Sequence, residues 1–133
     1  MLKVDVLADS KFPVDRKNIR ARVANLLAKF RMQGDVYVSV QVVGDRKMRG
    51  LNKKYRKLDR TTDVLSFPTN DPSQDVGDEG FVQAEELGLV LGDIVVSYPQ
   101  AVVQASQKQK LIDDVVGDLV EHAMLHLLGM HHD

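Results

Sequence analysis

The stretches Asp63-Val-Leu-Ser-Phe-Pro68 and Leu89-Val-Leu-Gly-Asp-Ile-Val-Val96 decide the fold of this 133-residue chain. Each is a short apolar run, which is typical of a buried strand, and Pro68 ends the first one. Residues 70–86 between them are polar and acidic, and we interpret this stretch as a surface loop. Because no helix is expected between the two strands, they are close enough along the chain to pair antiparallel.

Two strands and two helices are expected before this pair. Residues 2–6 and 36–42 alternate apolar and polar side chains, as strands with one buried face do. Residues 19–30 repeat apolar side chains at helical spacing, and a second helix follows Asp45, which we expect to cap it. A helix between consecutive strands favours at least one parallel pairing in the sheet.

Two more helices are expected at the end of the chain. Ser97 and Pro99 are typical of a helix start. The last helix is predicted to begin near residues 112–114, where two aspartates stand in its favourable first turn. The order of elements is therefore βαβαββαα, which predicts an α+β fold with a mixed four-stranded sheet and helices packed against it.

The length and composition indicate one domain without covalent cross-links. A chain of 133 residues can bury a core of its own. It has no cysteine, which excludes disulfides and thiolate ligands and fits a cytoplasmic protein. No apolar run approaches the length that spans a bilayer, and the N-terminus lacks a signal-peptide pattern, so no membrane association is expected.

All four histidines lie within residues 122–133, and their spacing indicates a metal site. His122 and His126 are one helical turn apart, Gly129 is expected to end the helix, and the turn can return His132 as a third ligand. Three imidazoles leave a tetrahedral position open, as in catalytic zinc sites, so we expect one zinc per chain. His131 could close the site instead, although the spacing favours His132. Core packing or a helix-end charge is the plainer alternative.

The histidine spacing equals that of the metzincin peptidases, H-E-x-x-H-x-x-G-x-x-H, with one difference. Those enzymes place a general-base glutamate directly after the first histidine, and here that position is Ala123. Glu121 precedes His122 and points about 100° away from it around the helix. A zinc metallopeptidase is therefore a weaker interpretation of the motif.

A basic segment suggests a polyanionic substrate. Between residues 46 and 60 stand eight of the 18 lysines and arginines of the chain, opposed within that span only by Asp59. Clustered basic side chains bind a phosphate backbone and release its counterions, although a solvated helix face is the common alternative. The residues expected to contact RNA phosphates are Arg46, Arg49, Lys53 and Lys57.

The motifs taken together resemble the YbeY family of bacterial rRNA maturation factors. That family carries H-G-x-L-H-L-x-G-Y-D-H near its C-terminus, together with upstream T-[DN]-V-L-S-F-P, G-D-I and L-N-x-x-Y-R motifs. The matching segments of this chain are His122-Ala-Met-Leu-His-Leu-Leu-Gly-Met-His-His132, Thr62-Asp-Val-Leu-Ser-Phe-Pro68, Leu91-Gly-Asp-Ile94 and Leu51-Asn-Lys-Lys-Tyr-Arg56.

The resemblance implies that residues 1–133 form a single metal-hydrolase domain. It implies a metal-dependent endoribonuclease of the single-strand type, acting in 16S rRNA 3′-end maturation and ribosome quality control. By position, His122, His126 and His132 hold zinc, and Arg56 stands beside the metal, where it would contact the scissile phosphate attacked by metal-activated water. An ion pair between Arg56 and Asp59 is the alternative. The implied partners are rRNA, the small ribosomal subunit, ribosomal proteins and assembly GTPases; the oligomeric state stays open.

Two departures from the family pattern affect the surroundings of the metal. Ala123 replaces a glycine, and His131 replaces the acidic neighbour of the third ligand, so His131 could orient a ligand or compete for the metal. Asp118 shares a helix face with His122 and could accept its second N–H, and Asp93 reads as a buried carboxylate that needs a partner. Asp63 and Ser66 are weaker candidates for ligand orientation or substrate contact. A non-catalytic ribosome-assembly factor, in which the metal only stabilises the C-terminus, is the second rival.

Overall fold

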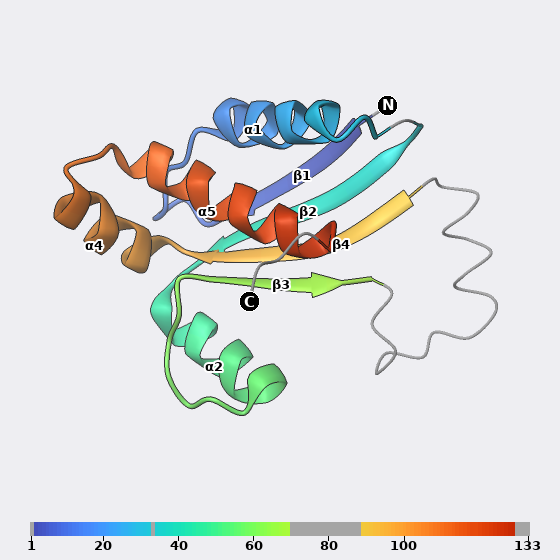
Figure 1. Cartoon of the computed structure of the whole chain (residues 1–133). Coiled ribbons are helices and arrows are strands. Elements are labelled where there is room, and N and C mark those ends of the chain that lie inside the picture. The colour runs from blue at the N-terminus through green and yellow to red at the C-terminus, as the bar shows by residue number, and fades with distance from the viewer. Residues whose placement is uncertain (1, 33, 70–88, 130–133) are drawn as a thin grey trace.

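The computed structural model describes residues 2–32, 34–69 and 89–129, and the elements follow the order βαβαββαα (Figure 1). The described elements are β1 (Leu2–Ala8), α1 (Arg16–Lys29), β2 (Val36–Val43), α2 (Asp45–Arg56), β3 (Val64–Pro68), β4 (Leu89–Ser97), α4 (Tyr98–Lys108) and α5 (Ile112–Leu127). Residues 70–88 and 130–133, which include His131 and His132, lie outside the described residues.

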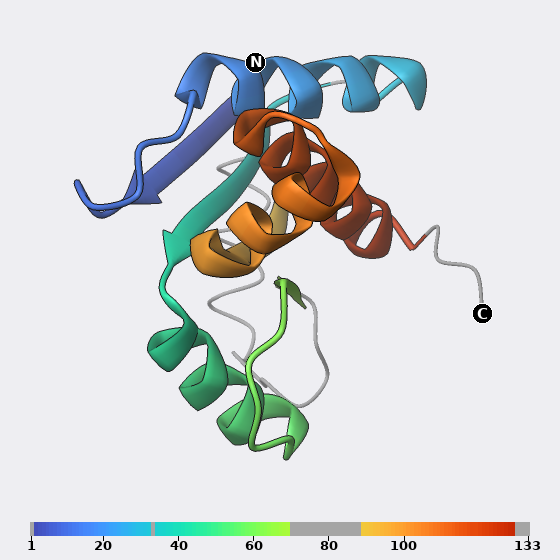
Figure 2. The ribbon, with the colours of Figure 1, turned by 90° about the vertical axis from the view of Figure 1, so that its left-hand side faces the viewer.

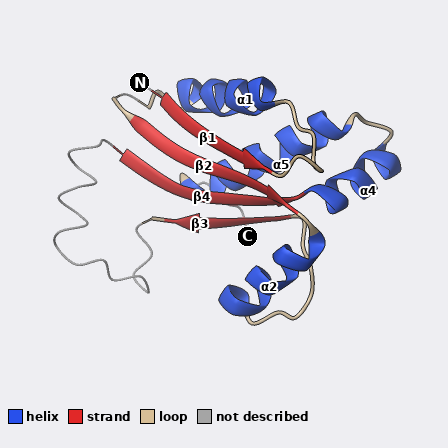
Figure 3. Ribbon diagram, turned by 180° about the vertical axis from the view of Figure 1, so that it is seen from behind, coloured by secondary structure: helices blue, strands red, loops and turns tan. Residues whose placement is uncertain are grey.

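The four strands form one mixed sheet in the order β1-β2-β4-β3 (Figure 3). β2 pairs in parallel with both β1 and β4, while β3 pairs antiparallel with β4. The antiparallel register sets Val64 opposite Val96 and Phe67 opposite Asp93. The predicted α+β class, the mixed sheet and the antiparallel pairing of the two quoted strands are all confirmed.

The two faces of the sheet pack against different helices. Ile94 and Val96 of β4 point into the main core, where α1, α4 and α5 cover the sheet (Figure 2). Val95, between them, points to the opposite face, where it packs with Leu65 of β3 and Met48 of α2. Strand side chains alternate between faces, so β4 contributes to both clusters. α5 and α2 therefore lie on opposite sides of β3 and β4.

α5 forms where the apolar pattern predicted the last helix. It begins at Ile112, and Asp113 and Asp114 stand in its first turn, where carboxylates favour the positive end of the helix dipole. Gly129 adopts a φ of +78° just beyond the last turn, a backbone conformation that glycine enters without a Cβ penalty. The buried side of the helix, at helical spacing, consists of Val115, Val116, Leu119, Val120, Ala123 and Met124.

The start of α2 differs from the prediction in one respect. Gly44, not Asp45, is the N-cap residue, and it makes no side-chain cap bond. The Asp45 carboxylate instead accepts hydrogen bonds from Thr61, Ser97 and Gln100, at 2.9, 2.8 and 3.2 Å. A cap bond would have used this carboxylate within its own helix. The tertiary structure uses it to join α2 to the segment before β3 and to the start of α4.

Ser97 caps α4 as predicted, since its hydroxyl accepts the Gln100 N–H at 3.3 Å. None of the helices in the described ranges is long and apolar enough to cross a membrane.

Candidate active site

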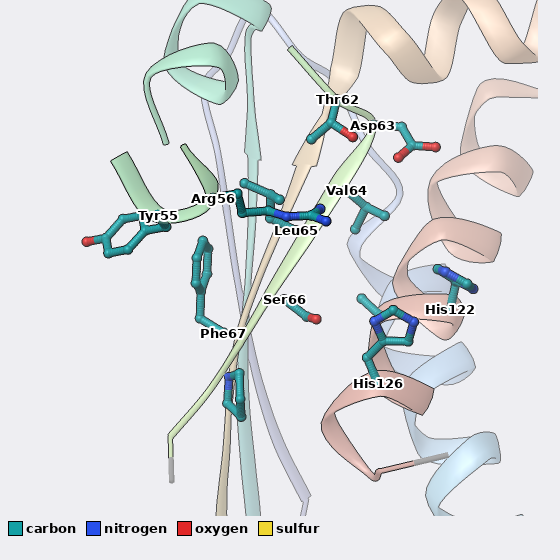
Figure 4. A pocket seen from close by; sticks show the side chains of 12 residues that line it. Tyr55, Arg56, Thr62, Asp63, Val64, Leu65, Ser66, Phe67, His122 and His126 are labelled. Carbon is teal, nitrogen blue, oxygen red and sulfur yellow. The ribbon is translucent and has the colours of Figure 1, made fainter. Parts of the chain in front are cut away.

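His122 and His126 stand one turn apart on the exposed side of α5, opposite the side that enters the core. Their ring centroids are 4.8 Å apart and the ring planes meet at 51°. Both rings extend towards β3 (Figure 4). Apolar side chains hold the other face of the helix in the core, so the helix places the two imidazoles side by side on its exposed face.

The donor chemistry of this pair fits a transition-metal ion. Neutral imidazole nitrogens are ligands that zinc accepts, and two histidines four positions apart on a helix can bind one ion. Within the described residues, no group of three His, Cys, Asp or Glu side chains is placed to hold a metal. Both candidates for the third ligand, His132 and His131, lie outside those residues, and their roles stay predictions.

The two histidines line a cavity of about 660 Å³ that also contacts β3 and the end of α2 (Figure 4). Its walls therefore come from two regions that are far apart in the sequence, residues 55–68 and residues 122–126. The lining residues are Tyr55, Arg56, Thr62, Asp63, Val64, Leu65, Ser66, Phe67, Pro68, His122, Ala123 and His126.

Arg56 is the last residue of α2, and its side chain extends towards β3 and lines this cavity (Figure 4). Lys57 adopts a left-handed conformation at φ 61° and ends the helix there. Asp59, the alternative partner considered for Arg56, is bound instead by Arg49, at 2.8 Å. Among the described residues no carboxylate forms an ion pair with Arg56, so its guanidinium is available for an anionic ligand.

The four residues predicted to contact RNA phosphates are all exposed, but none of them lines the histidine cavity. Arg49 is held by Asp59, and the hydrogen bond from Arg49 keeps the pKa of the Asp59 carboxyl below its usual value. Arg46 lines a different cavity, beside Phe12 and the end of β1. Lys53 and Lys57 extend the positive charge around the C-terminal end of α2, next to Arg56.

Asp63 belongs to the cavity and is oriented by a residue that the sequence did not single out. Gln104 of α4 donates a hydrogen bond from its Nε2 to the Asp63 carboxylate at 2.9 Å. Ser66, on β3, lines the cavity on the side of His126 (Figure 4). The spacing of 41 positions between Asp63 and Gln104 carries no local signal, so only the fold reveals this contact.

Asp93 is not the buried carboxylate that the apolar run suggested. It is exposed and accepts a hydrogen bond from Ser39 of β2. Its side chain shares a face with Val95, which packs on the α2 side of the sheet. Asp93 is therefore separated by the sheet from the two histidines of α5.

Asp118 is engaged elsewhere as well. Its carboxylate accepts hydrogen bonds from Arg22 at 2.8 Å and Lys110 at 2.6 Å, and not from His122, the candidate donor suggested by their shared helix face. Partial burial raises the pKa of Asp118, but the bonds from Lys110 and Arg22 outweigh that effect and keep it below its usual value. Arg22 also binds Glu121 at 3.3 Å, so this carboxylate points to α1, away from the histidine cavity.

Comparison with known proteins supports one family. The family model described as "Endoribonuclease YbeY" matches residues 7–133 of the chain. A protein of that description from Brevibacillus brevis is 37% identical over 99% of this chain and 85% of its own length. One from Roseiflexus castenholzii is 32% identical over 100% of this chain and 80% of its own. The solution structure of a Thermotoga maritima protein superposes with a TM-score of 0.60 at 26% identity, covering 98% of this chain and 75% of the other.

Proposed function

The chain belongs to the YbeY endoribonuclease family, and from this premise we propose that it cleaves single-stranded RNA in the cavity between α5 and β3. The observation that supports this site best is the placement of Arg56 in the same cavity as His122 and His126. A bound metal and a guanidinium can together activate a nucleophile and stabilise the charge that develops on a phosphodiester during cleavage. The cavity is the one place in the described residues that brings a histidine pair and an arginine together.

We propose that His122, His126 and His132 hold one zinc ion. When bound, zinc would act as a Lewis acid and lower the pKa of a bound water to about 7, which would provide a nucleophile near neutral pH. The chain's part is to keep both described imidazoles on one side of α5, with their nitrogens away from the apolar core.

Arg56 would bind the non-bridging oxygens of the scissile phosphate. A guanidinium offers two parallel N–H donors to a phosphate and stays charged at every physiological pH. The negative charge on these oxygens grows as the attacking oxygen adds to phosphorus, so the contact strengthens in the transition state. Removal of one such donor typically costs a factor of about 10²–10³ in kcat.

The cell role that we propose is maturation of the 16S rRNA 3′ end and ribosome quality control, in the cytoplasm. The partners would then be rRNA and the small ribosomal subunit, with ribosomal proteins or assembly GTPases. The exposed lysines of the last turn of α2, Lys53 and Lys54, support a polyanionic partner, because they share that turn with Arg56. A metallopeptidase is disfavoured since Ala123 stands where that class needs its general base.

The test is cleavage of a structured rRNA 3′-end fragment by protein of measured metal content. The wild type is compared with Arg56→Ala, Arg56→Lys and a charge-matched control, Lys17→Ala, which removes an exposed cation of α1. We expect Arg56→Ala to keep its metal and lose activity about 100-fold or more, and Arg56→Lys to fall between it and the wild type. Lys17→Ala should cut like the wild type.

Two results would count against the proposal. If neither the wild type nor the control cuts, the non-catalytic assembly-factor hypothesis takes its place. If all four proteins cut alike, the activity is a contaminant or Arg56 lies outside the reaction.

A further inference from the structure

The floor of the histidine cavity is the outer edge of β3. β3 is the last strand of the sheet in the described residues, which place β4 on one side of it and no strand on the other. Residues 62–68 all line the cavity, although the side chains of a strand alternate between two faces. An unbroken run of lining residues therefore means that the cavity follows the backbone edge of the strand.

The positions of the helices lead to the same conclusion. The cavity contacts His122 and His126 of α5 and Arg56 of α2, and these two helices lie on opposite faces of the sheet. A single cavity can touch both only by passing around the sheet edge. Figure 4 shows β3 running between the end of α2 on one side and α5 on the other.

The register identifies which backbone groups point outwards. Ser97 donates its N–H to the Asp63 carbonyl at 2.8 Å, and Thr69 donates to the Leu91 carbonyl at 3.2 Å. In an antiparallel ladder the hydrogen-bonded residues alternate, so Leu65 and Phe67 also bond to β4. The N–H and C=O groups of Val64 and Ser66 then point away from β4, to the outer edge. Pro68, two residues after Ser66, also has its backbone nitrogen on the outer edge, so its lack of an N–H removes no hydrogen bond to β4.

At the opposite edge of the sheet, side chains of the protein bind the backbone of the edge strand β1. Two arginines of α1 reach the β1 backbone, where Arg16 donates to the Val6 carbonyl at 2.7 Å and Arg20 to the Val4 carbonyl at 3.4 Å. No such contact is made to the outward groups of Val64 and Ser66 within the described residues. Among the described residues, side chains thus bind backbone groups of one edge strand, while the outward groups of Val64 and Ser66 beside the histidines have no such partner.

We propose that the outer edge of β3 hydrogen-bonds the Watson–Crick edge of an unpaired RNA base next to the scissile phosphate. Each outward residue offers an N–H donor and a C=O acceptor on the same side, and an unpaired base offers adjacent acceptors and donors. In a duplex those base groups are already paired. The edge would therefore select single-stranded RNA, and the inference rests on the proposed function of the same cavity.

RNA fits this edge better than an extended peptide does, because of charge. The C-terminal end of α2 carries three basic residues in its last turn, Arg56 among them, and Lys57 follows directly. A nucleotide bound at the β3 edge would place its phosphate beside these cations, while a peptide strand brings no such charge. The two histidines and Arg56 then lie within the same cavity as the phosphate.

Substitution at Ser66 isolates the edge donor. Ser66→Pro removes an N–H that points outwards and leaves the ladder to β4 intact, as Pro68 does naturally. Ser66→Ala is the matched control, because it removes the hydroxyl and keeps the N–H. Both changes are made in the wild type, where KM and kcat are measured on a single-stranded oligoribonucleotide. They are also made in Arg56→Ala, where the Kd for the same oligoribonucleotide is measured by fluorescence anisotropy.

We expect Ser66→Pro to raise Kd and KM at least about tenfold relative to Ser66→Ala, the loss expected for one hydrogen bond to a charged or well-placed partner. Equal Kd values for the two variants would overturn the proposal. Weakened binding of an extended peptide with unchanged RNA affinity would overturn it too, by assigning the edge to a protein strand.

A second measurement covers the case in which Ser66→Pro does not fold. Amide hydrogen exchange of Val64 and Ser66 in Arg56→Ala should slow on addition of the oligoribonucleotide, while the Thr69 amide, already bonded to β4, stays unchanged. No change at Val64 and Ser66 would overturn the proposal. Neither Kd nor amide exchange depends on cleavage. An inactive wild type would therefore overturn the proposed activity, while these two measurements would still test whether the β3 edge binds RNA.

Discussion

Gly92 of β4 lies so close to the carbonyl oxygen of Phe67 on β3 that a Cβ atom on Gly92 would be 2.2 Å from that oxygen. The same Cβ would lie 3.1 Å from Leu127 at the end of α5. Gly92 also has a φ of +146°, a conformation that other residues rarely adopt. This one glycine therefore sets how closely β4 approaches both the strand and the helix that line the histidine cavity.

We expect Gly92→Ala to lower the free energy of unfolding by at least about 2 kcal/mol, because it adds backbone strain and forces β3 away from β4. Gly50→Ala is the matched control, since Gly50 lies within α2 and a Cβ there meets nothing within 4 Å. That change should stabilise the protein by roughly 0.5–1 kcal/mol. Urea unfolding of both variants checks the prediction; equal effects would contradict it.

Metal content should identify the ligands. His122→Ala, His126→Ala and His132→Ala are each expected to reduce bound zinc from about one per chain to near zero, whereas His131→Ala should retain it. The readout is zinc by elemental analysis after dialysis against a weak chelator. Chelation should lower the melting temperature of the wild type and leave His126→Ala unaffected, because only the former has metal-binding energy to lose. Loss of zinc in His131→Ala alone would exchange the roles of the last two histidines.

Asp45 should stabilise the fold through its charge. Asp45→Ala leaves Thr61, Ser97 and Gln100 without their shared acceptor, and we expect a loss of roughly 2–4 kcal/mol. Partial burial raises the pKa of Asp45, but the three hydrogen bonds outweigh it and lower that pKa below its usual value. Asp45→Asn is the milder control, because it keeps one acceptor oxygen.

The sign of the pH effect follows from the lowered pKa of Asp45. Its stabilising contribution is present above the unfolded-state pKa of about 4 and is lost as the pH falls through the lower folded-state value. The stability difference between wild type and Asp45→Asn should therefore be constant from about pH 7 to about pH 5 and shrink below about pH 4. A difference that grows in acid would contradict the assignment.

Asp118 offers a test of whether it acts on the metal or on the fold. Its side chain is 44% exposed, so the loss of its bonds to Arg22 and Lys110 in Asp118→Asn should cost under about 1 kcal/mol of stability. We expect zinc affinity to change less than about threefold, because the carboxylate faces these cations and not His122. A tenfold or larger loss of zinc affinity would restore the role of Asp118 in orienting His122.

RNA binding should depend on salt through the basic end of α2. We expect the logarithm of the association constant to fall linearly with the logarithm of salt concentration. Lys53→Ala should reduce that slope by about 0.7, the value for one phosphate contact on a single strand. Lys17→Ala on α1 removes the same charge elsewhere and should leave the slope unchanged. Anisotropy titrations at several salt concentrations measure this slope. An association constant of the wild type that does not change with salt would exclude α2 from the binding surface.

The motif histidines show how much of the site a local pattern predicts. The apolar stripe of α5 and the spacing of His122 and His126 predicted a helix with both rings on one side, and the structure has this arrangement. The basic composition of α2 predicted exposed cations in the same way. Helical periodicity is a local property, because neighbours on a helix face are only three or four residues apart.

The carboxylates show where such patterns stop. Asp45, Asp93 and Asp118 all received roles from their neighbours in sequence, and the partners of all three come from other segments. A carboxylate accepts a hydrogen bond from any donor that packing brings near it. The identity of that donor is a property of the tertiary contacts, which spacing along the chain does not encode.

The sequence by itself determined the order of elements, the antiparallel pair, the helix that carries His122 and His126, and the family, because alternation, helical spacing and linear motifs are read within short windows. Only the tertiary structure decided which edge of the sheet is open and that α2 and α5 meet around it. That result depends on strand order, since β4 inserts between β2 and β3 and leaves β3 at the edge. Strand order follows from burying both faces of the sheet at once, and no short stretch of sequence contains that constraint.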